Sequence, residues 1–162
     1  MTDSPDPIRP TDDEARALAR SLIAAARFGA LGVIDPATGF PAVTRVALGP
    51  GPAGGLFTLV SGLSAHSRAL RTDPRVSLLV GEPGPKGDPL THPRLSLQAE
   101  ALPLPPDDPR RAGTRARWLA DHPKSKLYID LPDFFFVEFR LIAGALNGGF
   151  GRAFRLDAAD LT

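Results

Sequence analysis

Hydrophobic positions follow two different spacings along this 162-residue chain, and the change between them separates the predicted elements. Up to about Arg27 they recur every three or four residues, as at Leu18, Leu22 and Ile23, which predicts one amphipathic helix. Thr11-Asp-Asp-Glu14 has the form of a capping box at the start of that helix. After residue 27, short apolar or alternating runs between Gly- and Pro-rich breaks predict strands instead.

Six strands are predicted, each bounded by breaker residues. They cover residues 28–34, 41–48, 56–60, 75–81, 94–101 and 134–141. A short helix is expected over 61–71 and an arginine-rich helix over 110–122. A Rossmann fold is disfavoured, because no GxGxxG follows a strand. The hairpin-like spacing favours a mainly β member of the α+β class, a six-stranded antiparallel barrel with peripheral helices.

The length suits a single domain, which we expect to cover residues 11–155. Residues 1–10 contain three prolines and are expected to form a loose arm, and residues 156–162 a C-terminal tail. No stretch is apolar enough to cross a membrane, and the acidic, Pro-rich start is unlike a signal peptide. We therefore expect a cytoplasmic protein without a membrane part.

Composition and charge exclude several kinds of chemistry. The absence of cysteine excludes disulfides, thiolate metal sites and cysteine nucleophiles. A net charge of +1 argues against a nucleic-acid partner. The histidines do not show metal-site spacing, so no metal is expected. No GxSxG motif accompanies the serines, and no side chain is an evident acid–base catalyst, so the catalytic residues stay unassigned.

The segment Ser61-Gly-Leu-Ser-Ala-His-Ser-Arg68 is the most suggestive stretch of the chain. It leaves a strand and enters a helix, which places free backbone N–H groups beside hydroxyls and a cation, as in a phosphate cradle. The alternative is an ordinary Ser-rich helix cap, and the residues leave both interpretations open. Arg45 lies in an otherwise apolar strand, where a cavity-facing arginine needs an anionic partner.

Other conspicuous residues have structural interpretations. His92 and His122 each precede a proline, which favours a role in extended or turn backbone. The alternation within Phe134-Phe-Phe136 and the residues after it favours packing in the core. In Gly148-Gly-Phe-Gly-Arg152, however, three glycines around an aromatic residue would let the backbone approach a ligand closely.

Six motifs, in matching order over about residues 12–155, resemble the pyridoxamine 5′-phosphate oxidase-like FMN-binding split-barrel superfamily, nearest to its haem-utilisation branch. They are Pro41-Ala-Val-Thr-Arg45-Val46, Leu59-Val-Ser61-Gly-Leu-Ser64-Ala-His66-Ser67-Arg68-Ala-Leu70, Asp73-Pro-Arg-Val-Ser-Leu-Leu-Val80, Asp88-Pro-Leu-Thr-His92-Pro-Arg94-Leu95, His122-Pro-Lys-Ser-Lys-Leu-Tyr-Ile-Asp-Leu-Pro-Asp-Phe134 and Gly148-Gly-Phe-Gly-Arg-Ala153.

The resemblance implies a homodimer with FMN at the subunit interfaces. It places the FMN phosphate on Arg45, with Val46 beside it, and on the segment after the third strand. In that segment the cofactor-binding residues would be Ser61, Ser64, His66, Ser67 and Arg68. Arg94 or Gln98 would offer a polar side chain toward the flavin, and the partner subunit would contribute Phe150 and Arg152.

The chain also departs from these relatives. Ser64-Ala-His66 stands where the vitamin enzymes carry Ser-Arg-Lys, and their C-terminal substrate-phosphate motif is missing. The sequence stops soon after residue 155, where the haem-utilisation branch continues into a domain with a haem-ligating histidine. We expect an FMN-dependent oxidoreductase of unknown substrate. The alternatives are a haem-binding protein that uses His66, His92 or His122, and a flavin-free dimeric scaffold.

Overall fold

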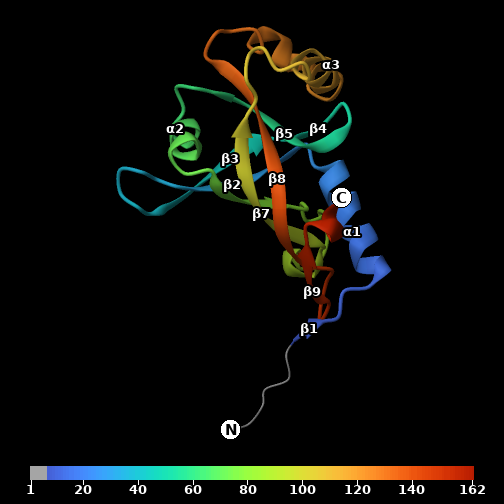
Figure 1. Cartoon of the computed structure of the whole chain (residues 1–162). Helices are drawn as coiled ribbons and strands as arrows, with labels where there is room; N and C mark the ends of the chain where they lie inside the picture. Colours follow the sequence, from blue (N-terminus) through green and yellow to red (C-terminus); the bar gives the residue numbers. More distant parts are fainter. Residues whose placement is uncertain (1–6) are drawn as a thin grey trace.

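The computed structural model describes residues 7–162, which form a strongly curved β-sheet with helices around it (Figure 1). Over this range the sheet has nine strands, in the order β1–β9–β8–β7–β6–β2–β3, while β5 pairs with β4 and β8. The strands are β1 Ile8–Arg9, β2 Phe28–Ile34, β3 Pro41–Ala47, β4 Gly49–Gly51, β5 Gly54–Ser61, β6 Arg75–Val80, β7 Arg94–Pro103, β8 Phe134–Asn147 and β9 Ala153–Asp157. The part of the expected arm over residues 1–6 lies outside the described residues.

Strand β8 holds the barrel together. One of its edges pairs with β7, while the other pairs first with β5 and then with β9. On the opposite side, β4 follows β3 directly and pairs with β5, but no ladder joins β3 itself to β5 in the described chain. A hydrogen bond of 2.7 Å from Thr58 Oγ1 to the Ala47 carbonyl spans this seam. The barrel is split there, so the predicted α+β split-barrel class is confirmed.

Two hydrophobic clusters fill the molecule. The barrel interior is packed with side chains from the inward positions of its strands, such as the fully buried Leu31, Leu78 and Leu97. The second cluster includes Trp118 and Phe136, and lies where α3 covers the outer side of β5 and β8. Each fully buried Leu or Phe side chain contributes roughly 1.5–3 kcal/mol. Because β8 is covered on both faces, its phenylalanines pack in the core, as predicted.

In the described part of the chain, three α-helices surround the barrel: α1 Asp13–Ala25, α2 Ala65–Thr72 and α3 Arg111–Asp121. Short 3₁₀ turns cover Pro89–Thr91, Pro123–Leu127 and Ala159–Leu161. The predicted cap of α1 was wrong by one residue. Asp12 caps the helix by accepting the Ala15 N–H at 2.8 Å, whereas Thr11 donates to the backbone carbonyl of Arg155. No helix within residues 7–162 is long and apolar enough to span a bilayer.

The predicted number of six strands was wrong, because three further strands form in segments rich in Pro and Gly or beyond the expected barrel. β1 lies in the expected arm, β4 in an expected turn, and β9 after the last predicted strand. β1 and β4 have two and three residues, too few to show a hydrophobic period, and they form because β9 and β5 offer edges with which they pair. Residues 156–162 also differ from the expected tail, since Leu156 and Leu161 are buried.

Candidate functional site

The outer face of the barrel carries a groove whose floor consists of small side chains. Two rows of directly paired residues cross it from β3 to β9, through β2, β6, β7 and β8. The first row is Val43, Gly32, Ser77, Gln98, Ala143 and Asp157, and the second is Arg45, Ala30, Leu79, Ser96, Ala145 and Arg155. Paired residues share a face of the sheet, so each row lies on this surface, which we call the outer groove.

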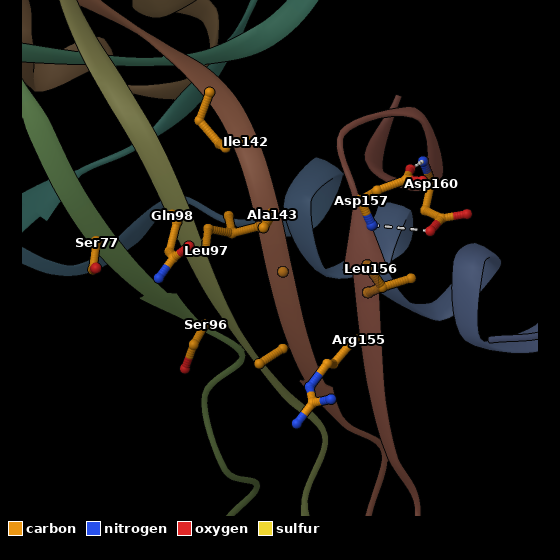
Figure 2. Close-up of a pocket in the computed structure, with 12 residues that line it drawn as sticks. Ser77, Ser96, Leu97, Gln98, Ile142, Ala143, Arg155, Leu156, Asp157 and Asp160 are labelled. Atoms are coloured by element: carbon orange, nitrogen blue, oxygen red, sulfur yellow. Dashed lines mark hydrogen bonds between the residues drawn. The ribbon is translucent and has the colours of Figure 1, made fainter. Parts of the chain in front are cut away.

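The outer groove contains two cavities of about 650 and 760 Å³ that share Ser77, Gln98 and Ile142. Figure 2 shows the first of them, with the hydroxyl and amide groups of β6 and β7 beside the β8 backbone. Exposed apolar side chains flank the polar floor, including Val43, which is 72% exposed, and Ile142, which is 45% exposed. A concave site that combines apolar surface with a few hydrogen-bonding groups is typical of small-molecule binding.

At the β6–β7 side of the outer groove, the charged side chains are paired with each other or with neighbours. Arg75 binds Asp73 at 2.6 Å, and its side-chain hydrogen bonds lower the pKa of Asp73 to about 2. Glu100 accepts from Arg140. Neither Arg75 nor Glu100 is therefore a free charge for a ligand.

At the β9 side, the two aspartates form a closed arrangement. Asp157 and Asp160 each accept the other's backbone N–H at 3.0 Å, which closes the turn after β9 (Figure 2). Arg16 of α1 donates to Asp160 Oδ1 at 2.6 Å, and this hydrogen bond lowers the pKa of the Asp160 carboxyl. The Asp160 carboxylate therefore fastens this turn to α1, while the Asp157 carboxylate closes the turn itself.

Two arginines of the second row remain uncommitted. Within residues 7–162, neither the Arg45 nor the Arg155 guanidinium has a hydrogen bond or an ion pair. Arg45 lies over the Phe28 ring, 5.6 Å from its centroid, a contact that leaves its N–H groups available. A guanidinium with five unused donors suits a phosphate or carboxylate.

The Ser61–Arg68 turn forms a closed hydrogen-bond network. Ser64 caps α2, and its Oγ lies 2.8 Å from the Ser61 carbonyl oxygen, 2.7 Å from Ser67 Oγ and 3.1 Å from His66 Nε2. Ser61 Oγ donates to Asp133 at 2.5 Å, and Arg68 donates to the carbonyl of Leu63. Ser67 is fully buried. These bonds are those of a helix cap, although the predicted phosphate role remains a prediction.

His66 and Arg45 do not share a cavity. His66 lines a cavity of about 240 Å³ together with Thr44, Asp35 and Ala69. Burial lowers the pKa of His66, so its neutral form is favoured in the folded protein. Because side chains alternate along a strand, Thr44 faces this cavity while Arg45 faces the outer groove. A ligand that touches both residues would have to extend around the β3 strand.

The other predicted site residues lie in several places. Val46 is buried in the barrel, so only its backbone is left for a ligand. Gln98 lines both cavities of the outer groove, while Arg94 donates to the Leu90 carbonyl at 2.9 Å. At the turn between β8 and β9, Phe150 is 96% exposed and Arg152 binds Glu14 at 2.8 Å.

The remaining two histidines have structural contacts. His92 Nδ1 accepts from the Gly84 N–H at 3.2 Å, and its Nε2 lies 2.9 Å from the Lys86 carbonyl. His122 Nε2 lies 2.8 Å from the Leu48 carbonyl, and its ring lies 4.4 Å from that of Trp118. Neither histidine lines the outer groove.

The sequence interpretation missed Ser77, Ser96, Ile142 and Arg155 as groove residues. Ser77 and Ser96 occupy outward positions in Val76-Ser-Leu78 and Leu95-Ser-Leu97, so the alternation could have marked an outer face that is polar and small. No comparable alternation in the sequence indicates Arg155. It reaches the groove because β9 pairs with β8, and that strand was not predicted.

Comparison with known proteins supports this architecture. A solved structure of 51% identity matches with a TM-score of 0.85, over 94% of this chain and 98% of that one. A protein of unknown function from Agrobacterium tumefaciens is 36% identical, with a TM-score of 0.80 over 98% of this chain. A heme binding protein from Mycobacterium smegmatis is 30% identical, with a TM-score of 0.81 over 95% of this chain. The chain spans 65% and 61% of the lengths of the last two proteins.

Neither a protein-family model nor a curated protein matches the sequence. At 13% identity, a protein of the pyridoxinephosphate oxidase family from Clostridium acetobutylicum shares the fold, with a TM-score of 0.69 over 94% of this chain and all of that one. The chain therefore has the fold found in pyridoxinephosphate oxidase family proteins.

Proposed function

We propose that this chain binds FMN in the outer groove and acts as a flavin-dependent oxidoreductase. The observation that carries the proposal is the groove itself, which has Gln98 and Ser77 among small residues in its floor and, within the described residues, an unpaired Arg45 at one end of the second row. A flat ring suits such a floor, and a phosphate suits a free guanidinium.

The residues present fit FMN in a specific way. Arg45 would hold the phosphate, and Gln98, Ser77 and Ser96 would hydrogen-bond the polar edge of the ring. The hydroxyls of the Ser61–Arg68 turn already have partners, so a phosphate there would have to exchange bonds with Ser64 or His66. Bound FMN would supply hydride exchange with a reduced nicotinamide or a small organic substrate, while the chain binds and orients it.

A second copy of the chain is proposed to cover the outer groove. Val43, Leu79 and Ile142 are between 44% and 72% exposed on this face, and a homodimer would remove them from water. In that arrangement Phe150 and Arg152 of one copy would approach the cofactor of the other, as the resemblance to the family implies. Light scattering tests the dimer, and a monomeric wild-type protein at micromolar concentration would contradict it.

Haem is the second candidate ligand, because the Mycobacterium smegmatis protein, 30% identical over 95% of this chain, is a heme binding protein. Against axial ligation in the outer groove, no His, Met, Cys or Tyr lines either cavity in the described chain. His66 lines only the smaller cavity. Haem bound through iron would therefore need a ligand from outside these two cavities, His66, His92 or His122, and the His→Ala variant of the ligating residue would lose the shift of the Soret band on haem addition.

The test of FMN binding uses a matched pair of flavins. Wild-type protein is titrated with FMN and with riboflavin, which lacks the phosphate, while flavin fluorescence is followed. Because hydrogen bonds to charged groups contribute about 1.5–3 kcal/mol, Arg45→Gln should weaken FMN binding roughly ten- to a hundredfold and leave riboflavin unchanged. Arg140→Gln, which removes a charge already paired with Glu100, is the control. Equal FMN affinity in wild type and Arg45→Gln would overturn this assignment.

A further inference from the structure

The charged side chains that line the two cavities of the outer groove, a set that does not include Arg45, differ in one respect. They are Arg75, Glu100, Arg155, Asp157 and Asp160. Four of them are held by the ion pairs and hydrogen bonds described above, and within residues 7–162 only the Arg155 guanidinium is not. We infer that Arg155 is a specificity-determining residue that binds a carboxylate or phosphate group of the substrate. This inference rests on the proposed function.

The position of Arg155 separates it from the proposed cofactor phosphate. Arg45 and Arg155 stand at opposite ends of one row, five strand-to-strand steps apart. At about 4.8 Å per step, they are about 24 Å apart along the sheet. Arg155 lines the first cavity whereas Arg45 lines neither cavity, so the two guanidiniums offer separate places for an anion. Arg45 takes the cofactor in the proposed function, and Arg155 is left for a second molecule.

The surroundings of Arg155 favour an anionic ligand over a structural role. Figure 2 shows its side chain directed from β9 toward the β7–β8 side of the groove, away from the turn that Asp157 and Asp160 close. The neighbours in its row are Ala145 and Ser96, which offer little bulk and no carboxylate. Once a ligand or a second copy covers the groove, an unpaired guanidinium there would be costly, and a bound carboxylate or phosphate removes that cost.

The experiment measures equilibrium binding to FMN-loaded and FMN-free protein by calorimetry. NADP⁺ is the phosphate probe, benzoate is the carboxylate probe, and benzamide is the neutral counterpart of benzoate. The variants are Arg155→Gln, Arg155→Lys and Arg75→Gln. Arg75 lies in the same groove but is already paired with Asp73, so its loss changes net charge equally without removing a free guanidinium.

Wild-type protein should bind at least one of the two anions, and Arg155→Gln should weaken that binding at least about tenfold. Arg155→Lys should recover part of the affinity, while benzamide binding and the Arg75→Gln variant should not change. If NADP⁺ binding weakens in Arg155→Gln, the recognised group is a phosphate, and if benzoate binding weakens, it is a carboxylate. The inference is overturned if no anion binds, if Arg155→Gln binds both anions as wild type does, or if Arg75→Gln causes the same loss.

The two proposals fail in distinguishable ways. If FMN does not bind, the proposed function fails, and the calorimetry on FMN-free protein still shows whether Arg155 holds an anion. If FMN binds with equal affinity to wild type and Arg155→Gln but neither anion responds to the variant, the cofactor assignment stands and the role of Arg155 is wrong.

Discussion

The Ser61–Arg68 turn and the outer groove differ in how their polar groups are used. In the turn, the hydroxyls of Ser61, Ser64 and Ser67 all have protein partners, and His66 lies within hydrogen-bond distance of Ser64. In the outer groove, the guanidiniums of Arg45 and Arg155 have no hydrogen bond or ion pair within the described chain. A local motif rich in polar residues therefore reports a helix cap as readily as a ligand site, whereas uncommitted donors across a sheet face are the stronger indication of a missing partner.

The same substitution in the two regions should give the largest contrast. Ser67 is fully buried, so Ser67→Val adds a methyl group to packed surroundings and removes a hydrogen-bond partner of Ser64. We expect a loss of about 1–3 kcal/mol in the free energy of unfolding. Ser96 is exposed in the groove, and Ser96→Val should stay within about 0.5 kcal/mol of wild type. Urea unfolding of both variants makes the comparison, and equal losses would show that the two regions do not differ.

Removing the helix cap should have the next largest effect. Ser64 accepts the Ser67 N–H at the start of α2, so Ser64→Ala should destabilise the protein by about 1 kcal/mol. Ser21→Ala on the exposed side of α1 is the control and should cost nothing, since alanine favours a helix. A Ser64→Ala variant with normal stability but much weaker FMN binding would instead make the turn a phosphate cradle.

Acidic pH should affect the turn through His66. Burial lowers the pKa of His66 in the folded state, while the unfolded chain keeps a pKa of about 6.5. The unfolded state therefore binds more protons as the pH falls below that value, and wild type should lose stability relative to His66→Gln until the folded-state pKa is passed. Unfolding of both proteins at pH 8 and pH 5.5 measures the difference.

Repeating the comparison of wild type and His66→Gln with and without inorganic phosphate shows whether His66 binds a phosphate group. A phosphate held at His66 would favour the imidazolium and raise its pKa, so inorganic phosphate would shrink or reverse the difference. An unchanged difference in phosphate and in a zwitterionic buffer would keep the turn as a structural cap. A wild-type protein that gains stability over His66→Gln on acidification without phosphate would contradict the stated direction.

The sequence predicted the parts of the fold whose periodicity is long enough to detect. Helix α1 and strands β2, β3, β6 and β7 lie within a few residues of their predicted bounds, because each repeats its hydrophobic period several times. Strands β1, β4 and β9 were missed, since their pairing depends on partners distant in the sequence. The end of β8 was missed for a related reason, because Ala143–Asn147 pair with β9 and contain small residues.

The candidate site could be predicted only in part. Arg45 was singled out as a cation in an otherwise apolar strand and Gln98 through the resemblance to a family, and both face the outer groove. Arg155 could not be found, because its position depends on the register in which it pairs with Ala145. Whether the guanidinium of an arginine has a protein partner also depends on tertiary contacts. Arg75 and Arg155 look alike in the sequence, but only Arg75 is paired in the described chain.

The smallest expected effect is the change in protein stability when Arg45 or Arg155, neither of which has an ion pair in the part of the chain that the structure describes, is replaced. Arg45→Gln and Arg155→Gln remove no ion pair, so the free energy of unfolding should change by less than about 0.5 kcal/mol in each. Arg16→Gln, which breaks two ion pairs including the one that fastens α1 to Asp160, should be measurably less stable. Thermal and urea unfolding provide the comparison. A loss above about 1 kcal/mol in either groove variant would mean that its guanidinium already has a structural partner, and the case for an anion at that end of the groove would fail.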